Sequence, residues 1–191
     1  PIARVMQNLL GVTMCGIVGY VGDRKAAPVL LEGLRRLEYR GYDSAGIALG
    51  ADPIDIHKAV GRVADLNAVV PTDLASSVGI AHTRWATHGG GTVENAHPHA
   101  DSKGRIAVVH NGIIENAGVL RERLEEEGVV FQSETDTEVL AHLFAKCMRD
   151  QTDAVAAIST ALQLVRGTWG IAVLFSDLPD TIIAARNGSP L

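Results

Sequence analysis

Cys15 is the residue of this chain whose type and position could do covalent chemistry, because it directly follows Met14 and leads into the apolar run GIVGY. If Met14 is the initiator and is removed, Cys15 carries a thiol and a free α-amine on one residue. A thiol with a pKa of about 8.5 is only slightly ionised at neutral pH, whereas an α-amine with a pKa of about 8 can accept its proton, directly or through one water. The sequence therefore predicts a nucleophile suited to attack on a carboxamide or another acyl carbon.

Residues 1–13 precede this methionine, and an amine that is locked in a peptide bond cannot act as a base. The segment has one arginine, no acidic residue and no continuous apolar stretch of the kind that a secretory signal needs. Three interpretations stay open: a foreign or wrongly assigned upstream sequence, a propeptide that is removed, or an extension retained on an inactive protein. We favour the first, because the small side chain of Cys15 suits removal of Met14. We therefore predict an N-terminal extension over 1–14 and a domain over 15–191.

Composition and charge exclude several classes of protein. A length of 191 residues fits one domain with a sizeable core. The 17 basic and 22 acidic residues give a net charge of -5, and no basic run exceeds two residues, which argues against nucleic acid or an anionic membrane as a partner. No apolar run approaches the ~18 residues that a membrane span needs. The two cysteines, Cys15 and Cys147, exclude a disulfide framework and a cysteine-rich zinc site and favour a reducing cytoplasm.

Hydrophobic periodicity predicts helices and strands that occur in clusters. Apolar residues at spacings of three and four predict an amphipathic helix over 24–38 and further helices near 62–69 and 116–127. Thr135 and Glu138 have the spacing of a capping box, so a helix should begin there. Its apolar face should be Val139, Leu140, Leu143, Phe144 and Cys147, and the next helix should turn Val155, Ile158, Leu162 and Val165 inward. Short strands are expected at 16–20, 46–49, 54–59, 78–81, 106–110, 169–175 and 181–185, with a long loop over 87–104.

This order of elements favours an α+β fold. Helices and strands do not alternate regularly, as they would in a parallel βαβ sheet, so mixed or antiparallel sheets covered by helices are expected. The chain ends at Leu191 directly after an apolar strand. We therefore expect it to stop inside a fold.

Four sequence blocks resemble one known family. They are MCGIVGY from Met14, LRRLEYRGYDSAG from Leu34, HTRWATHG from His82 with NAHPH from Asn95, and VVHNGIIEN from Val108 with SETDTE from Ser133. Their order and spacing over 15–191 resemble the glutamine amidotransferase domains of the N-terminal-nucleophile type, and among these the domains of glutamine–fructose-6-phosphate aminotransferases. The runs EYRGYDSAG and HTRWATHG are closer to that family than to amidophosphoribosyltransferases, asparagine synthetases or glutamate synthases.

The resemblance implies a four-layer αββα sandwich of mostly antiparallel sheets, with the C-terminal part of the domain missing beyond Leu191. It implies no cofactor and no bound metal. The family protein has a second, sugar-phosphate isomerase half, which is absent from this chain, and the full-length protein is expected to be a homo-oligomer.

The resemblance also implies a role for individual residues. Cys15 would attack the side-chain amide carbon of L-glutamine, release ammonia and form a glutamyl thioester that water converts to glutamate. The side-chain amide of Asn111 and the backbone N–H of Gly112 would form the oxyanion hole. Arg84 would bind the substrate α-carboxylate, and Asp136 would bind its α-ammonium.

Further residues would support these groups. Arg40 and Gly41 would support the nucleophile. The glutamine pocket and its loop would be lined by Trp85, Thr87, His88 and His97. The glycines at 89–91 depart from the more substituted pattern usual in the family, so this loop should cost more to order and should close less tightly over glutamine.

Other readings of the same residues stay open. Taken alone, Cys15 would be a small buried residue, Asp136 a carboxylate favoured by a helix dipole, and Arg84 an ion-pair partner. The dipeptide at 111–112 is also a good turn. A second hypothesis, after that of an enzyme domain, is a catalytically silent fragment that keeps the fold and binds glutamine.

Histidines raise two further alternatives. One is a metal site, which we disfavour because a third convergent ligand is not evident. The other is an imidazole base paired with Cys15, as in Cys/His hydrolases. The residues concerned are His82, His88, His97, His99 and His110.

Overall fold

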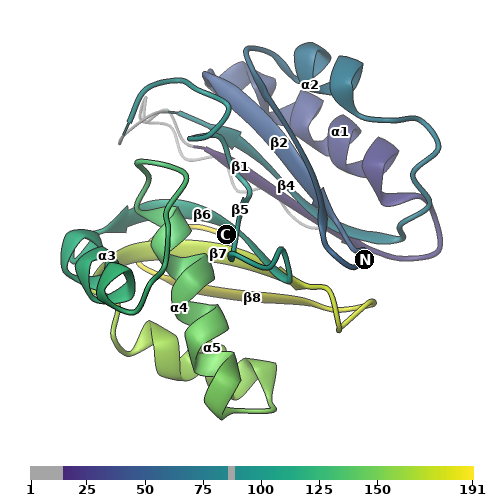
Figure 1. The fold of residues 1–191 in the computed structure, drawn as a ribbon. Coiled ribbons are helices and arrows are strands. Elements are labelled where there is room, and N and C mark those ends of the chain that lie inside the picture. The colour runs from purple at the N-terminus through teal and green to yellow at the C-terminus, as the bar shows by residue number, and fades with distance from the viewer. Residues whose placement is uncertain (1–14, 86–88) are drawn as a thin grey trace.

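Two antiparallel sheets lie face to face, with helices on their outer sides (Figure 1). The structure is a computed structural model and describes residues 15–85 and 89–191. The first sheet has the strand order β1-β4-β2-β3. Its strands are β1 (Gly16–Val21), β2 (Ser44–Leu49), β3 (Asp55–Val60) and β4 (Val78–Arg84).

The second sheet has the strand order β5-β6-β7-β8, and every pairing within it is antiparallel. Its strands are β5 (His99–Ala100), β6 (Ile106–Ile114), β7 (Gly167–Phe175) and β8 (Ile182–Asn187). The segment over 87–104 was expected to be a loop throughout. Within it, both residues of the short β5 pair with β6 and form the edge of the sheet.

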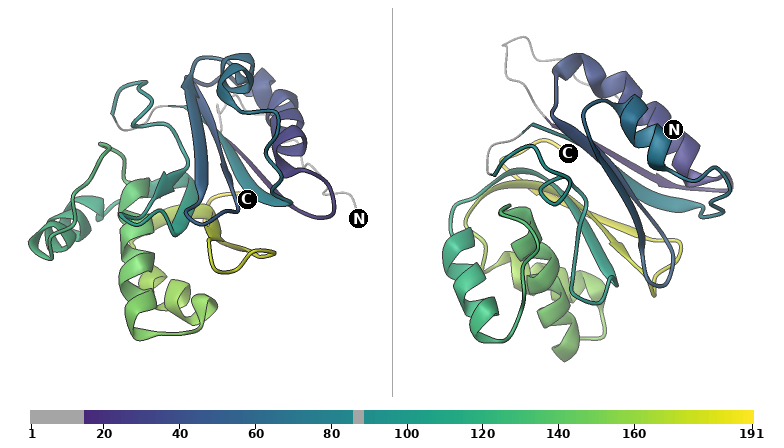
Figure 2. Two further views of the ribbon diagram at one scale, coloured as in Figure 1. Left: turned by 45° about the vertical axis from the view of Figure 1, so that its right-hand side comes forward. Right: turned by 45° about the horizontal axis from the view of Figure 1, so that its top comes forward.

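Helices cover the outer face of each sheet (Figure 2). The first sheet carries α1 (Ala26–Leu37) and α2 (Val63–Val69), with the 3-10 turn η1 (Glu38–Arg40) after α1. The second carries α3 (Ala117–Glu126), α4 (Thr137–Asp150) and α5 (Ala154–Leu162). None of these described helices combines the length and the apolar character that crossing a bilayer requires. The arrangement confirms the predicted α+β sandwich of four layers.

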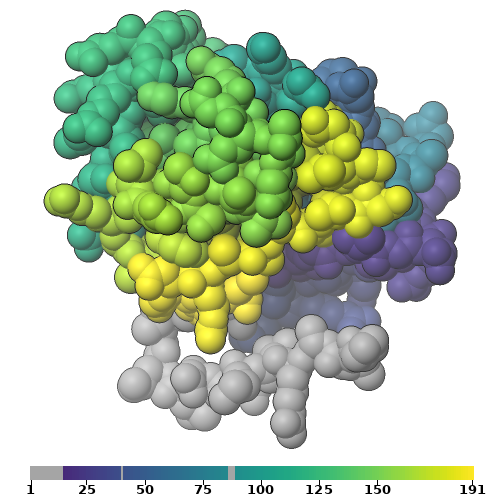
Figure 3. All heavy atoms as spheres, turned by 90° about the horizontal axis from the view of Figure 1, so that it is seen from below, coloured from purple at the N-terminus to yellow at the C-terminus, as the bar shows by residue number. Residues whose placement is uncertain are grey.

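Apolar side chains fill the space between the two sheets. Ile80 of β4 and Val109 of β6 are fully buried there, together with Leu174 of β7. Every residue of β4 is buried, because α1 covers one face of the strand and the second sheet covers the other. Ile17 of β1 and Ile182 of β8 pack against the same cluster, and Figure 3 shows the C-terminal residues (yellow) against the N-terminal ones (purple).

One predicted helix face is wrong in part. Val155 was expected to point inward, but its side chain is 59% exposed. Ile158, Leu162 and Val165 do pack against the core cluster, as predicted. The fully buried part of the face consists of small residues and Ile158, because α4 packs against α5. These residues are Ala154, Ala157, Ile158 and Ala161. Cys147, expected in the core, is only half-buried at the edge of the cluster around α4.

Replacing Phe144 by alanine should lower the free energy of unfolding by ~3–5 kcal/mol, because this fully buried ring of α4 fills the core under the second sheet. Chemical denaturation followed by circular dichroism would measure the loss. The control is Val155→Ala, which should change stability by less than ~0.5 kcal/mol since that side chain is exposed. Equal losses in both variants would contradict this account of the core.

Candidate active site

The thiol of Cys15 lies where β1 begins and β4 ends. Gly16 of β1 pairs with Thr83 of β4, which brings the residue before β1 next to the residue after β4. The backbone N–H of Trp85 therefore donates to Cys15 Sγ at 3.2 Å, and the thiol faces the Trp85 carbonyl at 3.9 Å. Both of these contacts are to the backbone of Trp85, a residue that is 45% exposed.

This environment keeps the thiol protonated. Burial raises the pKa of the Cys15 thiol, although the Trp85 backbone N–H opposes that effect by stabilising the thiolate. A nucleophilic step at this sulfur therefore needs a proton acceptor. Among the described residues, both hydrogen-bond contacts of Sγ are to the Trp85 backbone, and no imidazole contacts it. His88, one of the histidines considered as that base, lies outside the described residues.

Asn111 reaches Cys15 from the opposite sheet. It lies on β6, and its side-chain Nδ2 donates to the Cys15 carbonyl oxygen at 3.2 Å. Its Oδ1 accepts a hydrogen bond from His82 Nε2 at 2.9 Å. Because a carbonyl oxygen only accepts, both contacts require the same orientation of the amide, with its NH2 group toward Cys15.

His82 is the residue whose role the sequence did not indicate. It lies on β4 with no exposed surface, and burial lowers its pKa to about 3 despite the hydrogen bond with Asn111. The ring is therefore neutral and carries its proton on Nε2, where Asn111 accepts it. The pattern HTR on a buried strand could have signalled an inward-facing imidazole, but not its partner.

Other histidines pack behind His82. The His97 ring centroid lies 4.3 Å from that of His82 and 4.9 Å from that of His99, and all three side chains are buried. The part of the chain that the structure describes holds no group of three or more potential ligands placed to bind a metal ion. The role of His97 as a pocket wall stays a prediction.

Gly112 follows Asn111 on β6 and has a φ of 129°, a conformation that side chains disfavour. A Cβ at this position would overlap the carbonyl oxygen of Thr168 on β7. The two strands can therefore approach this closely only with glycine at 112, and that approach fixes the backbone next to Asn111.

Asp136 is tied to the end of the same strand. Its Oδ2 accepts a hydrogen bond from the backbone N–H of Ile114 at 2.8 Å. It occupies the N-cap position of α4 without accepting a hydrogen bond from that helix's backbone. Its carboxylate therefore contacts β6 at Ile114, two residues beyond Gly112. An interaction with the dipole of α4 alone does not explain this contact.

Arg84 ends β4, and its side chain is almost fully buried. Its Nη1 donates to the Gly90 carbonyl at 3.2 Å and lies 3.7 Å from Asp43 Oδ1. The guanidinium is thus held at the base of the segment that follows β4, one residue from the Trp85 amide that contacts the thiol.

The remaining predicted site residues are less closely tied to the thiol. Gly41 caps the 3-10 turn, and its N–H donates to the Glu38 carbonyl at 3.1 Å. Arg40 ends that turn, and its role stays a prediction. Thr87 and His88 lie outside the described residues.

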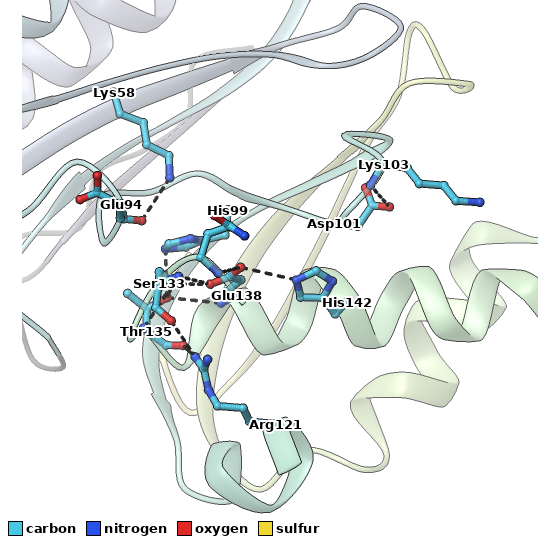
Figure 4. Close-up of polar contacts among 11 residues, drawn as sticks. Lys58, Glu94, His99, Asp101, Lys103, Arg121, Ser133, Thr135, Glu138 and His142 are labelled. Atoms are coloured by element: carbon cyan, nitrogen blue, oxygen red, sulfur yellow. Dashed lines mark hydrogen bonds and ion pairs between the residues drawn. The ribbon is translucent and has the colours of Figure 1, made fainter. Parts of the chain in front are cut away.

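A buried polar network holds the segment that carries Asp136 (Figure 4). The Glu138 carboxylate accepts from the backbone N–H groups of Gln132 and Ser133 at 2.8 and 2.7 Å and from Ser133 Oγ at 2.6 Å. The expected capping box is only half formed: the Glu138 N–H donates to Thr135 Oγ1 at 3.4 Å, but the carboxylate reaches further back along the loop. Arg121 closes the network by donating to the Ser133 and Thr135 carbonyls.

Burial opposes ionisation of Glu138, but the His142 ring, 3.5 Å from the carboxylate, and hydrogen bonds from Ser133 and the Gln132 backbone outweigh it and lower the pKa of this carboxyl to about 2. The carboxylate is therefore charged at neutral pH and holds the loop in place. His99 extends the network through a 3.0 Å contact between its Nε2 and Thr135 Oγ1.

Facing antiparallel sheets with a cysteine at the first strand define this fold as an N-terminal-nucleophile sandwich. Two solved structures share it: glutamine phosphoribosylpyrophosphate amidotransferase from B. subtilis, complexed with ADP and GMP (TM-score 0.71, 28% identity), and a structure described as the allosteric regulatory enzyme of purine biosynthesis (TM-score 0.74, 29% identity). They cover 91% and 90% of this chain, and each match spans 37% of the other chain.

Residues 82–189 match the family described as "Glutamine amidotransferase domain". The chain is 52% identical over 182 residues to the glutamine–fructose-6-phosphate aminotransferase [isomerizing] of Bacteroides thetaiotaomicron, and 56% identical over 181 residues to that of Symbiobacterium thermophilum. Each match covers 93% of this chain but only 30% and 29% of the relative. The chain therefore belongs to the glutamine amidotransferase domain family.

Replacing Glu138 by glutamine should lower the free energy of unfolding at pH 7 by roughly 2 kcal/mol, because two backbone N–H donors lose a charged acceptor. A carboxyl whose pKa is lowered by folding stabilises the fold above its unfolded pKa. The difference between parent and variant should therefore shrink as the pH falls from 5 toward the folded pKa of about 2.

Urea denaturation at several pH values would measure this dependence. Glu122→Gln, on the exposed part of α3, is the matched control and should show little effect. A difference that is independent of pH would contradict the role given to the Glu138 charge.

Proposed function

We propose that this chain is the glutaminase part of a glutamine–fructose-6-phosphate aminotransferase. It hydrolyses L-glutamine to glutamate and ammonia at Cys15, and the full-length protein uses the ammonia to make glucosamine 6-phosphate. The observation that carries the proposal is the contact of the Asn111 NH2 group with Cys15, fixed by His82 from the other side. An amide donor held beside a half-buried nucleophile is the arrangement that acyl transfer needs.

In the reaction, Cys15 Sγ attacks the side-chain amide carbon of glutamine while its proton passes to the α-amine of the same residue. Negative charge develops on the amide oxygen, where Asn111 Nδ2 and the Gly112 N–H donate to it. Collapse of this intermediate breaks the C–N bond, and the protonated amine returns its proton to the departing ammonia. Water then attacks the glutamyl thioester, with the amine as base, and releases glutamate and the thiol.

Substrate recognition falls to two charged side chains. The Arg84 guanidinium binds the α-carboxylate of glutamine, and the Asp136 carboxylate binds its α-ammonium. Trp85, Thr87, His88 and His97 line the pocket. Arg40 and Gly41 support the nucleophile from the turn after α1.

The proposal extends to the partners of the domain. A sugar-phosphate isomerase half, outside this chain, receives the ammonia, and the full-length protein is a cytoplasmic homo-oligomer that needs no cofactor. The purified 191-residue chain should therefore make no glucosamine 6-phosphate and should at most hydrolyse glutamine.

Residues 1–14 support a second candidate function, a silent domain that binds glutamine without hydrolysing it, because a blocked amine removes the base. An amidophosphoribosyltransferase domain fits less well. The solved structure of such an enzyme is 28% identical to this chain, whereas the aminotransferases reach 56%.

The state of the N-terminus separates the two main candidates. A chain that begins at Cys15 should hydrolyse glutamine at least about a hundredfold faster than a chain that keeps 1–14, because general-base assistance contributes roughly that much. Intact mass spectrometry would identify the first residue, and glutamate release would give the rate. Equal rates from both chains would show that another group accepts the thiol proton.

Asn111→Ala should lower kcat about a hundredfold to a thousandfold, because one oxyanion donor is lost. The KM for glutamine should change little, since this donor acts on the transition state. The control is Asn67→Ala, which removes only an exposed contact with Arg35. If Asn111→Ala had the kcat of the parent, Asn111 would not be part of the oxyanion hole.

A further inference from the structure

Asn95 is a buried side chain that joins two loops of the site. It lies on the segment after β4, and only 2% of its surface is exposed. Its Oδ1 accepts a hydrogen bond from the Glu134 backbone N–H at 2.9 Å, and its Nδ2 donates to Glu134 Oε2 at 3.2 Å. The two residues thus bond to each other through both ends of the Asn95 amide.

The same amide also reaches the Arg84 guanidinium through one carbonyl. Asn95 Nδ2 donates to the Gly90 oxygen at 3.1 Å, and Arg84 Nη1 donates to that oxygen at 3.2 Å. Both hydrogens and the oxygen of the Asn95 amide are therefore used, which leaves it one orientation.

Gly89 is required for this contact. It has a φ of 70°, and a Cβ there would lie 2.5 Å from Asn95 Nδ2 and 2.9 Å from Glu134 Oε2. Gly90 and Gly91 are under no such constraint, because a Cβ at either would meet its nearest atom at 3.8 or 3.7 Å. Of the glycines at 89–91, Gly89 is thus the one that allows the segment after β4 to contact the loop of Glu134.

The far side of this contact is rigid. Glu134 lies between Ser133, which Glu138 holds by two hydrogen bonds, and Thr135, whose carbonyl accepts from Arg121. Asp136 follows directly and is fixed to Ile114. A displacement of Glu134 is therefore passed on to Asp136 rather than absorbed by a flexible loop.

We propose that Asn95 and Glu134 form a brace that sets the spacing between Arg84 and Asp136, and so are positioning residues for recognition of the amino-acid end of the substrate. This inference rests on the proposed function, in which Arg84 binds the α-carboxylate and Asp136 the α-ammonium. The brace acts on substrate binding and leaves the thiol and its oxyanion donors unchanged, because its hydrogen bonds involve neither Cys15 nor Asn111.

Glu134→Ala tests the brace without disturbing the core, since Glu134 lies at the surface. We expect the KM for glutamine to rise about tenfold, as the loss of a hydrogen bond to a charged group implies, with kcat within about twofold of the parent. Glu134→Gln keeps an oxygen that can accept from Asn95 and should restore most of the affinity. Glu126→Ala, on the surface of α3, is the control and should match the parent.

Labelling of Cys15 by two thiol reagents distinguishes a role in substrate recognition from a merely structural role. A diazo-ketone analogue of glutamine needs the amino-acid site, whereas iodoacetamide needs only the thiol. In Glu134→Ala the rate of Cys15 labelling by the diazo-ketone should fall about tenfold, in proportion to KM, while labelling by iodoacetamide stays at the parental rate. Equal slowing with both reagents would show a general loss of structure and overturn the proposal.

The parent chain, prepared to begin at Cys15, keeps the two levels of inference apart. If the parent hydrolyses glutamine and Glu134→Ala has the parental KM, the brace is wrong and the proposed function stands. If the parent neither hydrolyses glutamine nor reacts with the diazo-ketone, the proposed function is wrong, and the role of the brace in substrate recognition falls with it.

Discussion

The site depends on one polar contact made across an apolar interface, the contact of Asn111 from the second sheet with Cys15 from the first. The two sheets face each other through aliphatic side chains, which provide burial but little directional information. The hydrogen bond from His82 to Asn111 fixes the orientation of the Asn111 amide. The imidazole N–H requires an acceptor and the Cys15 carbonyl requires a donor, so the amide fits in one orientation. Relative displacement of the sheets would separate Cys15 from the Asn111 side chain that donates to its carbonyl oxygen.

Burial shifts the pKa values of the thiol and the imidazole of this region in opposite directions. It raises the pKa of the Cys15 thiol and lowers that of His82, so both groups are uncharged at neutral pH. Glu138 is also buried but stays ionised, since backbone and hydroxyl donors converge on its carboxylate. The buried charge of Glu138 thus holds the loop of Asp136, whereas the protonated thiol needs a proton acceptor before it can react.

The sequence predicted the elements more reliably than their contacts. The helix at α1 and the strands of both sheets follow from periodicity, because burial of one face imposes it. The inward face of α5 was predicted in part wrongly, since alanines at 154, 157 and 161 allow close helix packing that a search for large apolar residues overlooks. The capping box at Thr135 was half right, because the path of the preceding loop decided which N–H groups Glu138 reaches.

The sequence by itself determined the order of the motifs and the family, and it predicted Cys15 as the nucleophile, because these depend on residue type and spacing along the chain. Only the tertiary structure decided that Asn111 meets both Cys15 and His82, and that Asn95 joins Glu134 to the carbonyl that Arg84 binds. Asn111 is separated from His82 by 29 positions and from Cys15 by 96, and Asn95 is separated from Glu134 by 39. No local pattern encodes such pairings. They arise when the packing of two sheets and the folding of two loops bring distant polar groups within hydrogen-bond distance, where burial makes an unsatisfied partner costly.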